Sequence, residues 1–136
     1  MKPGRELDAL IAEKIMGWEF HNAYAGERYL FPPHLIEFVQ SSISMKSGLM
    51  EFVPPAPPYY STDIKDAWKV IEEMESRKFI LRLQSPAYMS YRWTALFQNK
   101  CISDDDFIDR ANSFHFNTAP LAICNAALMA LGEYRE

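Results

Sequence analysis

Hydrophobic side chains recur at helical spacing in three stretches of the chain, residues 1–18, 61–76 and 117–132. Two other stretches, residues 78–84 and 88–99, alternate between apolar and polar side chains, as a half-buried strand does. These two stretches follow each other across a Ser-Pro turn, so we expect them to pair antiparallel. The pattern therefore predicts three helices and at least one pair of strands.

The sequence of the first helix predicts where it begins and where it ends. Pro3 suits a helix start, and Glu6 and Asp8 lie in or near the first turn, where acidic side chains interact favourably with the helix dipole. Gly17 is expected to end the helix, with Trp18 folding back onto it. The face expected to be buried consists of Leu7, Leu10, Ile11 and Ile15.

The second helix follows a proline-rich segment, PPAPPYYSTD, that cannot continue a strand. Ser61 or Thr62 is the predicted N-cap, with Asp63 in the first turn. Tyr59 and Tyr60 should point to opposite sides of an extended chain, one inward and one outward. The free N–H groups of the helix start below them would suit an anion. The predicted buried stripe is Ile64, Ala67, Trp68, Ile71 and Met74.

The third helix is rich in alanine and should approach its neighbours closely. Thr118 is its predicted N-cap, Pro120 lies in its first turn and Gly132 ends it. Cys124 falls on its apolar stripe, where a cysteine usually acts as a small hydrophobic residue. The stripe consists of Leu121, Cys124, Leu128 and Leu131.

The remaining segments are less regular. Residues 19–36 are dense in aromatic side chains and are predicted to form an ordered loop, and residues 37–53 a hairpin, with a short helix over 34–41 as the alternative. The whole chain, residues 1–136, is expected to be one domain. The predicted class is an α/β (α+β) layered sandwich, with an antiparallel sheet of about three to five strands packed by about three helices. The second and third helices are expected to share a layer.

Composition narrows the function. The chain has 136 residues, a formal net charge of -4 and no basic stripe, which argues against duplex nucleic acid as a partner. Cys101 and Cys124 do not make a disulfide framework. No run of residues resembles a signal peptide or a membrane span. We therefore expect a cytoplasmic protein that does not contact a membrane.

Residues that could bind a metal or a phosphate group, or catalyse a reaction, do not show the spacing that such sites require. The histidines and cysteines lack the spacing of metal ligands, and the aspartates at 104–106 lack the rest of a calcium loop. No glycine-rich phosphate loop occurs. Cys124 lacks a recognisable base, so it is a poor candidate nucleophile. We predict no metal, no cofactor and no catalytic residue, although an enzyme is not excluded.

Aromatic and arginine residues form the main candidate binding site. Stacking on tyrosine or tryptophan together with bidentate arginine contacts would hold a small, anionic, nucleotide-like ligand. The alternative is that the rings belong to the core and the arginines are solvated or pair with helix acids. The candidate residues are Tyr59, Tyr60, Ser61, Thr62, Arg82, Tyr91, Arg92, Trp93 and His115.

Three blocks of the sequence, GRELDALIAEKIMGW, PPYYSTDIKDAWKVIEEM and NTAPLAICNAALMALG, carry a family resemblance in their order and spacing. They resemble the phage ABA sandwich domain family, small phage and prophage proteins. The matching positions are Gly17, Trp18, Pro58, Tyr60, Ser61, Thr62, Asp63, Trp68, Thr118–Cys124 and Ala126–Leu128.

The chain departs from the family pattern in two places. Residues 19–57 are longer and more hydrophobic, and mark a family-variable region. Phe114, His115 and Phe116 replace small residues before the last helix. The resemblance implies a layered α/β domain from a phage genome, but it implies no reaction. If the chain is phage-encoded, its compartment is the host cytoplasm.

Together these observations favour a non-enzymatic phage accessory protein. Its most specific form is an anti-defence protein that sequesters a nucleotide-derived host immune signal. One alternative is a protein-interaction or structural module that docks to a host or phage protein through the aromatic 19–60 region. Another is a nucleotide-acting enzyme with His115 as its base. A homo-oligomer is expected, because the chain carries more aromatic side chains than a monomer of this size can bury.

Overall fold

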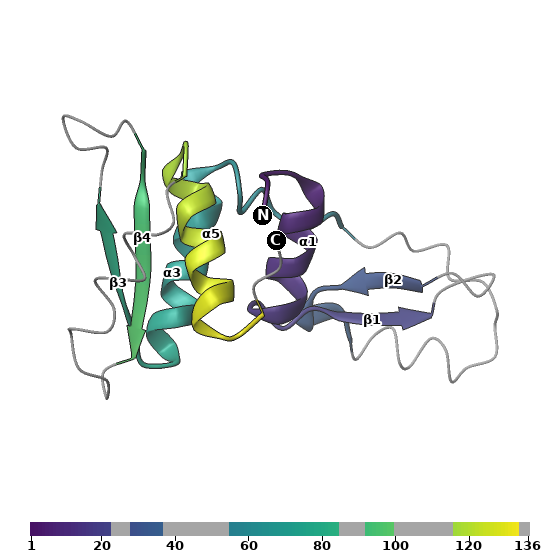
Figure 1. Cartoon of the computed structure of the whole chain (residues 1–136). Helices are drawn as coiled ribbons and strands as arrows, with labels where there is room; N and C mark the ends of the chain where they lie inside the picture. The colour runs from purple at the N-terminus through teal and green to yellow at the C-terminus, as the bar shows by residue number, and fades with distance from the viewer. Residues whose placement is uncertain (23–27, 37–54, 85–91, 100–115, 134–136) are drawn as a thin grey trace.

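The computed structural model describes residues 1–22, 28–36, 55–84, 92–99 and 116–133. Its helices and strands follow the order shown in Figure 1. They are α1 (Arg5–Lys14), β1 (Glu19–Asn22), β2 (Arg28–Phe31), α3 (Ile64–Ser76), β3 (Phe79–Gln84), β4 (Thr94–Asn99) and α5 (Ala119–Ala130). The class is an α+β sandwich, as predicted from the sequence.

The end of α1 follows the sequence prediction. Gly17 adopts a φ of 80°, a left-handed conformation that costs a glycine little. The Trp18 N–H then donates to the Ala12 carbonyl at 2.9 Å, and the Trp18 ring is only 8% exposed. The stop therefore directs the chain back along α1 and buries the ring against it.

Residues 19–36 are not the loop that the sequence suggested. β1 and β2 pair antiparallel, with Phe20 opposite Leu30. Each strand has only four residues, so each face shows two side chains and no period can be recognised in the sequence. Residues 33–36 are helical, in agreement with the helix alternative for 34–41. The predicted hairpin over 37–53 lies outside the described residues.

The start and the buried face of α3 differ from the predictions. Its N-cap is Asp63, whose side chain accepts from the Lys65 N–H at 2.8 Å, rather than Ser61 or Thr62. The buried side chains are Ala67, Val70, Ile71 and Met74. Because Val70 belongs to this stripe, the helix is rotated so that Ile64 and Trp68 face outward, with 51% and 57% of their surface exposed.

The predicted pairing of the two later strands is confirmed, since β3 and β4 form an antiparallel sheet. Trp93 extends this sheet through an isolated antiparallel bridge to Phe116. The described strands form two separate two-stranded sheets, β1–β2 and β3–β4, where the sequence suggested one larger sheet. Lys78, between α3 and β3, has a φ of 71° and closes a tight turn between them.

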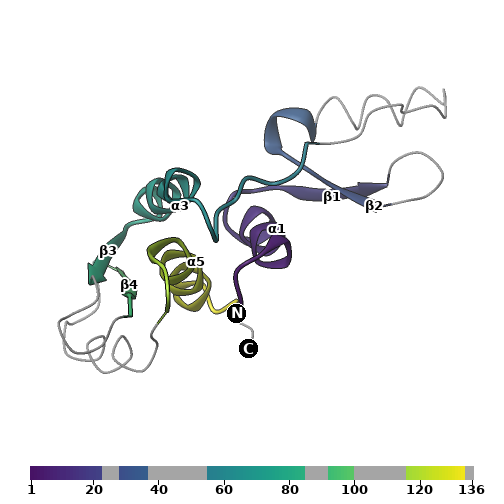
Figure 2. The same ribbon diagram turned by 90° about the horizontal axis from the view of Figure 1, so that it is seen from above.

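Helix α5 lies at the centre of the molecule. The predicted cap is present, because Thr118 Oγ1 accepts from the Leu121 N–H at 3.4 Å, and Gly132 has a φ of 73° at the other end. Figures 1 and 2 show α5 beside α3, with the β3–β4 sheet on one side of this pair and α1 on the other. Every residue from Pro120 to Leu128 is buried as a result.

Candidate functional site

Ser61 stands where the proline-rich segment turns into α3, and it is completely buried. Its N–H and its hydroxyl both donate to Asp8 Oδ1 of α1, at 2.8 and 2.7 Å. Its Oγ also accepts from the Gly4 N–H at 3.0 Å. The serine therefore joins the start of α3 to the start of α1. Ser61 is one of the positions that match the family pattern. Its contact with α1 was not predicted from the sequence.

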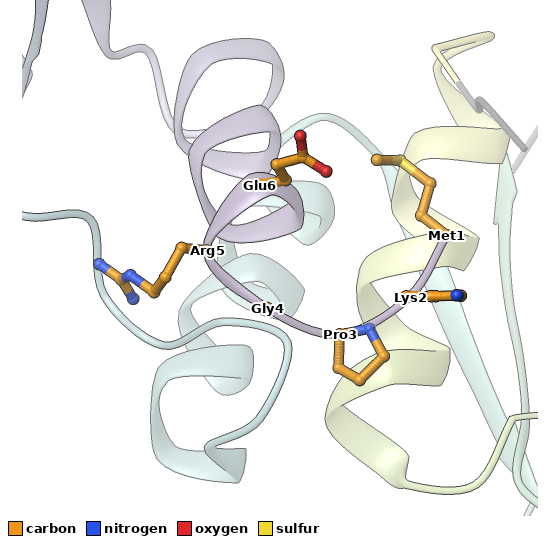
Figure 3. A pocket seen from close by; sticks show the side chains of 6 residues that line it. All are labelled: Met1, Lys2, Pro3, Gly4, Arg5 and Glu6. Carbon is orange, nitrogen blue, oxygen red and sulfur yellow. The ribbon is translucent and has the colours of Figure 1, made fainter.

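Asp8 is a fully buried carboxylate, and Arg5 balances its charge. Arg5 Nη1 donates to Asp8 Oδ2 at 2.9 Å, three residues away along α1. Arg5 also donates through Nη2 to the Pro57 carbonyl, and its guanidinium carbon lies 4.3 Å from the centre of the Tyr59 ring. Figure 3 shows Arg5 reaching away from α5. One arginine thus connects a buried acid, the proline-rich segment and a surface ring.

The two tyrosines point in opposite directions, as the extended segment predicted. Tyr60 is 2% exposed, whereas Tyr59 is 57% exposed. Burial raises the pKa of Tyr60 to about 12, with the negative charge of Asp66 adding to the effect. The Tyr59 backbone N–H donates to Asp66 Oδ2 at 2.9 Å, which fixes the exposed residue to the first turn of α3.

Helix α5 closes this junction from the other side. The Cys124 thiol is fully buried and donates to the Tyr60 carbonyl at 3.1 Å. Burial, reinforced by the charge of Asp8, raises the pKa of Cys124, so the thiol stays protonated and is a poor nucleophile. Asn125, which no sequence pattern singled out, is also buried here, and its Nδ2 donates to the Leu121 and Met1 carbonyls.

The anion site expected at the start of α3 is already occupied by acidic side chains. Asp63 caps the helix, and Asp66 binds the backbone of Tyr59. Both carboxylates use the N–H groups or the positive end of the dipole that an anionic ligand would need. The start of α3 itself therefore offers little to a further anion, and the positive charge that contacts Tyr59 is that of Arg5.

The other predicted binding residues lie on the opposite side of the helices. Arg82 of β3 is exposed and pairs with Leu96 of β4, and Arg92, just before β4, is also exposed. Trp93 is half-buried and packs against the core. Because α3 and α5 stand between this sheet and α1, these side chains do not share a site with Tyr59–Thr62 (Figure 2). Tyr91 and His115 lie outside the described residues.

A second arginine–aromatic pair lies on the hairpin. The guanidinium carbon of Arg28 on β2 lies 4.8 Å from the centre of the Phe20 ring on β1, and 38% of the phenylalanine surface is exposed. Arg28 faces Asn22 in the register, so it lies diagonally across from Phe20, within reach of a long side chain. Without the hairpin, the sequence could not show that these two residues meet.

The described residues were also compared with what a pocket, a metal site or a membrane span requires. An open hollow lies along the segment that leads into α1, lined by Met1–Glu6 (Figure 3). Within the described ranges, no cluster of three or more His, Cys, Asp or Glu could hold a metal ion. The described helices are also too short or too polar to cross a membrane.

Comparison with known proteins points to one family. The family model described as the phage ABA sandwich domain matches residues 9–128. The crystal structure of a phage protein from Bacillus cereus ATCC 14579 is similar, with a TM-score of 0.55 and 20% sequence identity. The match covers 100% of this chain and 93% of the Bacillus cereus chain. At this identity the likeness shows the fold alone. No curated protein matches the sequence.

Proposed function

The chain belongs to the phage ABA sandwich domain family, and we propose that it is a phage accessory protein that acts by binding another protein. The observation that carries this proposal is the pair of exposed arginine–aromatic contacts, Arg5 with Tyr59 and Arg28 with Phe20. We call the surface that these four residues mark the α1-side surface. Tyrosine and arginine are the residue types that most often dominate binding energy at protein interfaces.

Tyr59 is held ready for contact before any partner arrives. Its backbone N–H is bound by Asp66, and its carbonyl accepts from the Asp63 N–H at 2.8 Å. Its ring lies under a guanidinium that is itself fixed by Asp8. A side chain that is already ordered loses little conformational entropy on binding, which favours affinity.

The hairpin offers the second contact. Figures 1 and 2 both show β1 and β2 projecting from the end of α1, away from α5 and from the β3–β4 sheet. Phe20 and Arg28 therefore lie on a hairpin that projects from the helices, where a second protein can contact them. A ring that is partly exposed and capped by a cation combines an apolar surface with a positive charge.

The chemistry of the two pairs suggests the chemistry of the partner. Guanidinium groups favour carboxylates, which they bind in a bidentate manner. The rings beneath them favour an apolar side chain. We therefore propose a partner protein, from the host or the phage, that presents acidic side chains around an apolar residue. Both proteins would meet in the host cytoplasm.

Site-specific photo-crosslinking tests the proposal in infected cells. A benzophenone amino acid replaces Phe20 in one variant and Tyr59 in another, and the crosslinked protein is identified by mass spectrometry. Ile80 on β3 is the matched control position, because it is a comparably exposed apolar residue on the other side of the helices. We expect the same partner at positions 20 and 59 and its absence at position 80.

A reconstituted complex then tests the chemistry. The purified partner is titrated calorimetrically with the wild type and with Phe20→Ala, Arg28→Ala and Tyr59→Ala. Each variant is expected to weaken binding by about tenfold or more, the usual size of a hot-spot loss. Wild-type affinity in all three variants, or crosslinking at position 80 as strong as at positions 20 and 59, would contradict the proposed surface.

Sequestration of a nucleotide-derived immune signal, an anti-defence activity, is the second candidate function. It is supported by the exposed Arg82 and Arg92, which the strand alternation directs to the same side of the β3–β4 sheet. Their positions are separated by roughly 13 Å along the strands, so they would contact different phosphates of one ligand. Purified protein from infected cells is heated, and the released small molecules are identified. A nucleotide retained by the wild type but lost in Arg82→Ala and Arg92→Ala would favour this function.

A further inference from the structure

The outward face of α3 carries two large apolar side chains that the fold leaves uncovered. Ile64 is 51% exposed and Trp68 is 57% exposed. They are four residues apart on one helix, so their side chains are neighbours on its surface. Burial of such side chains favours association, because it removes apolar surface from water. We call this the α3 face, and it shares no residue with the α1-side surface.

The charged residues on the α3 face are ordered by sign along the helix. Lys65 and Lys69 lie in its first half, whereas Glu72 and Glu75 lie in its second half, and all four are exposed. Lys69 already pairs with Asp66 of the same helix at 3.8 Å. Lys65 and Glu72, three residues before and four residues after Trp68, are the charges that flank this ring on the helix surface.

This order of charges complements itself. If two α3 helices lie antiparallel about a twofold axis between Trp68 and Lys69, Lys65 of each copy comes opposite Glu72 of the other. A parallel arrangement would instead place Lys65 against Lys65 and Glu72 against Glu72, which repel. Trp68 lies beside the axis of the antiparallel arrangement, and Ile64, one turn nearer the start of the helix, lies just beyond Lys65 toward each end of the contact. The partner that fits the α3 face is thus a second copy of the chain.

We propose that the protein forms a twofold homodimer through antiparallel packing of α3 on α3, with Trp68 at the centre and a Lys65–Glu72 pair on each side. Such an interface is isologous, because the same patch of each copy faces the other. The proposal does not depend on the proposed function. The four residues that mark the α1-side surface take no part in the proposed contact.

The first test compares two exposed aromatic residues. The molar mass of the whole chain is measured by analytical ultracentrifugation over a range of protein concentrations. Trp68→Ala is expected to raise the dimer dissociation constant by about tenfold or more, as loss of a central tryptophan does at other interfaces. Tyr59→Ala, at a ring with the same exposed fraction of 57%, should leave the dissociation constant unchanged.

The second test reverses the charges. Lys65→Glu and Glu72→Lys, made singly, each place like charges opposite one another in the dimer and should weaken it. The double variant restores opposite charges and should recover the dimer. Both changes favour the folded helix, because they place an acid near its start and a base near its end. Loss of the dimer in the single variants therefore cannot arise from a destabilised α3.

Three results would overturn the proposal. One is a wild-type protein that remains a monomer up to submillimolar concentration. Another is a dimer that Trp68→Ala leaves intact. The third is a dimer that both single charge changes break and that the double charge reversal fails to restore. Circular dichroism of each variant checks that the helices are retained, so that each mass refers to a folded protein.

Discussion

Asp8 and Ser61 are 53 positions apart in sequence, yet two hydrogen bonds of 2.8 and 2.7 Å join them inside the protein. The carboxylate replaces water for two donors that are both buried, one from the backbone and one from the hydroxyl. Through this contact α1 holds the segment that positions Tyr59. The stability of the junction and the geometry of the exposed ring are therefore linked.

Replacing Asp8 by alanine should destabilise the fold strongly. Asp8→Ala leaves the Ser61 N–H buried without an acceptor and leaves its hydroxyl only the Gly4 carbonyl at 3.3 Å, and we expect a loss of about 2–3 kcal/mol in the free energy of unfolding. Urea denaturation measures it. Glu6→Ala is the matched control, since Glu6 is an acid in the same turn but is exposed, and it should change stability by less than about 0.5 kcal/mol. Equal effects of the two variants would count against the role assigned to Asp8.

The cap of α3 can be assigned by a pair of substitutions. Asp63→Ala removes the acceptor of the Lys65 N–H and should cost about 1 kcal/mol of stability. Thr62→Ala should be nearly neutral, because the Thr62 backbone N–H, and not its side chain, is what binds the Tyr59 carbonyl. Thermal unfolding followed by circular dichroism measures both. A larger loss for Thr62→Ala than for Asp63→Ala would return the cap to the position first expected from the sequence.

The thiol of Cys124 should be unreactive in the folded protein. Burial removes it from solvent and raises its pKa, so the reactive thiolate is scarce. In a Cys101→Ser variant, a colorimetric thiol reagent should modify Cys124 only as urea unfolds the chain. The modification curve is expected to coincide with the unfolding curve. Rapid modification in the absence of urea would show that α5 is less tightly enclosed than described.

Alkaline pH should weaken the fold through Tyr60. Its pKa is raised from 10.0 to about 12 in the folded protein, so the unfolded chain loses the phenolic proton first as the pH rises. The contribution is fully present below pH 10 and is lost between pH 10 and about 12, at up to about 1.4 kcal/mol per pH unit. Urea denaturation across this range should show the decline. Tyr60→Phe should have a shallower pH dependence, and an identical slope would contradict the assignment.

Features that depend on neighbouring residues could be predicted from the sequence. Gly17, Thr118 and Gly132 mark helix ends because a left-handed φ or a side-chain cap acts within one or two turns. The alternation of β3 and β4 likewise follows from side chains pointing to opposite faces of a strand. The three sequence blocks were enough to predict the family, which the match to residues 9–128 confirms.

Which side chains of those elements are buried, and which of them meet, depends instead on how the elements pack in three dimensions. Helix α3 has several apolar positions, and its rotation against α5 and β3 left Trp68 exposed and made Val70 part of the core. The contact of Asp8 with Ser61, and the choice of Tyr60 rather than Tyr59 as the inner ring, join segments that are distant along the chain. Local propensity does not encode such contacts, because they depend on how whole elements pack against one another.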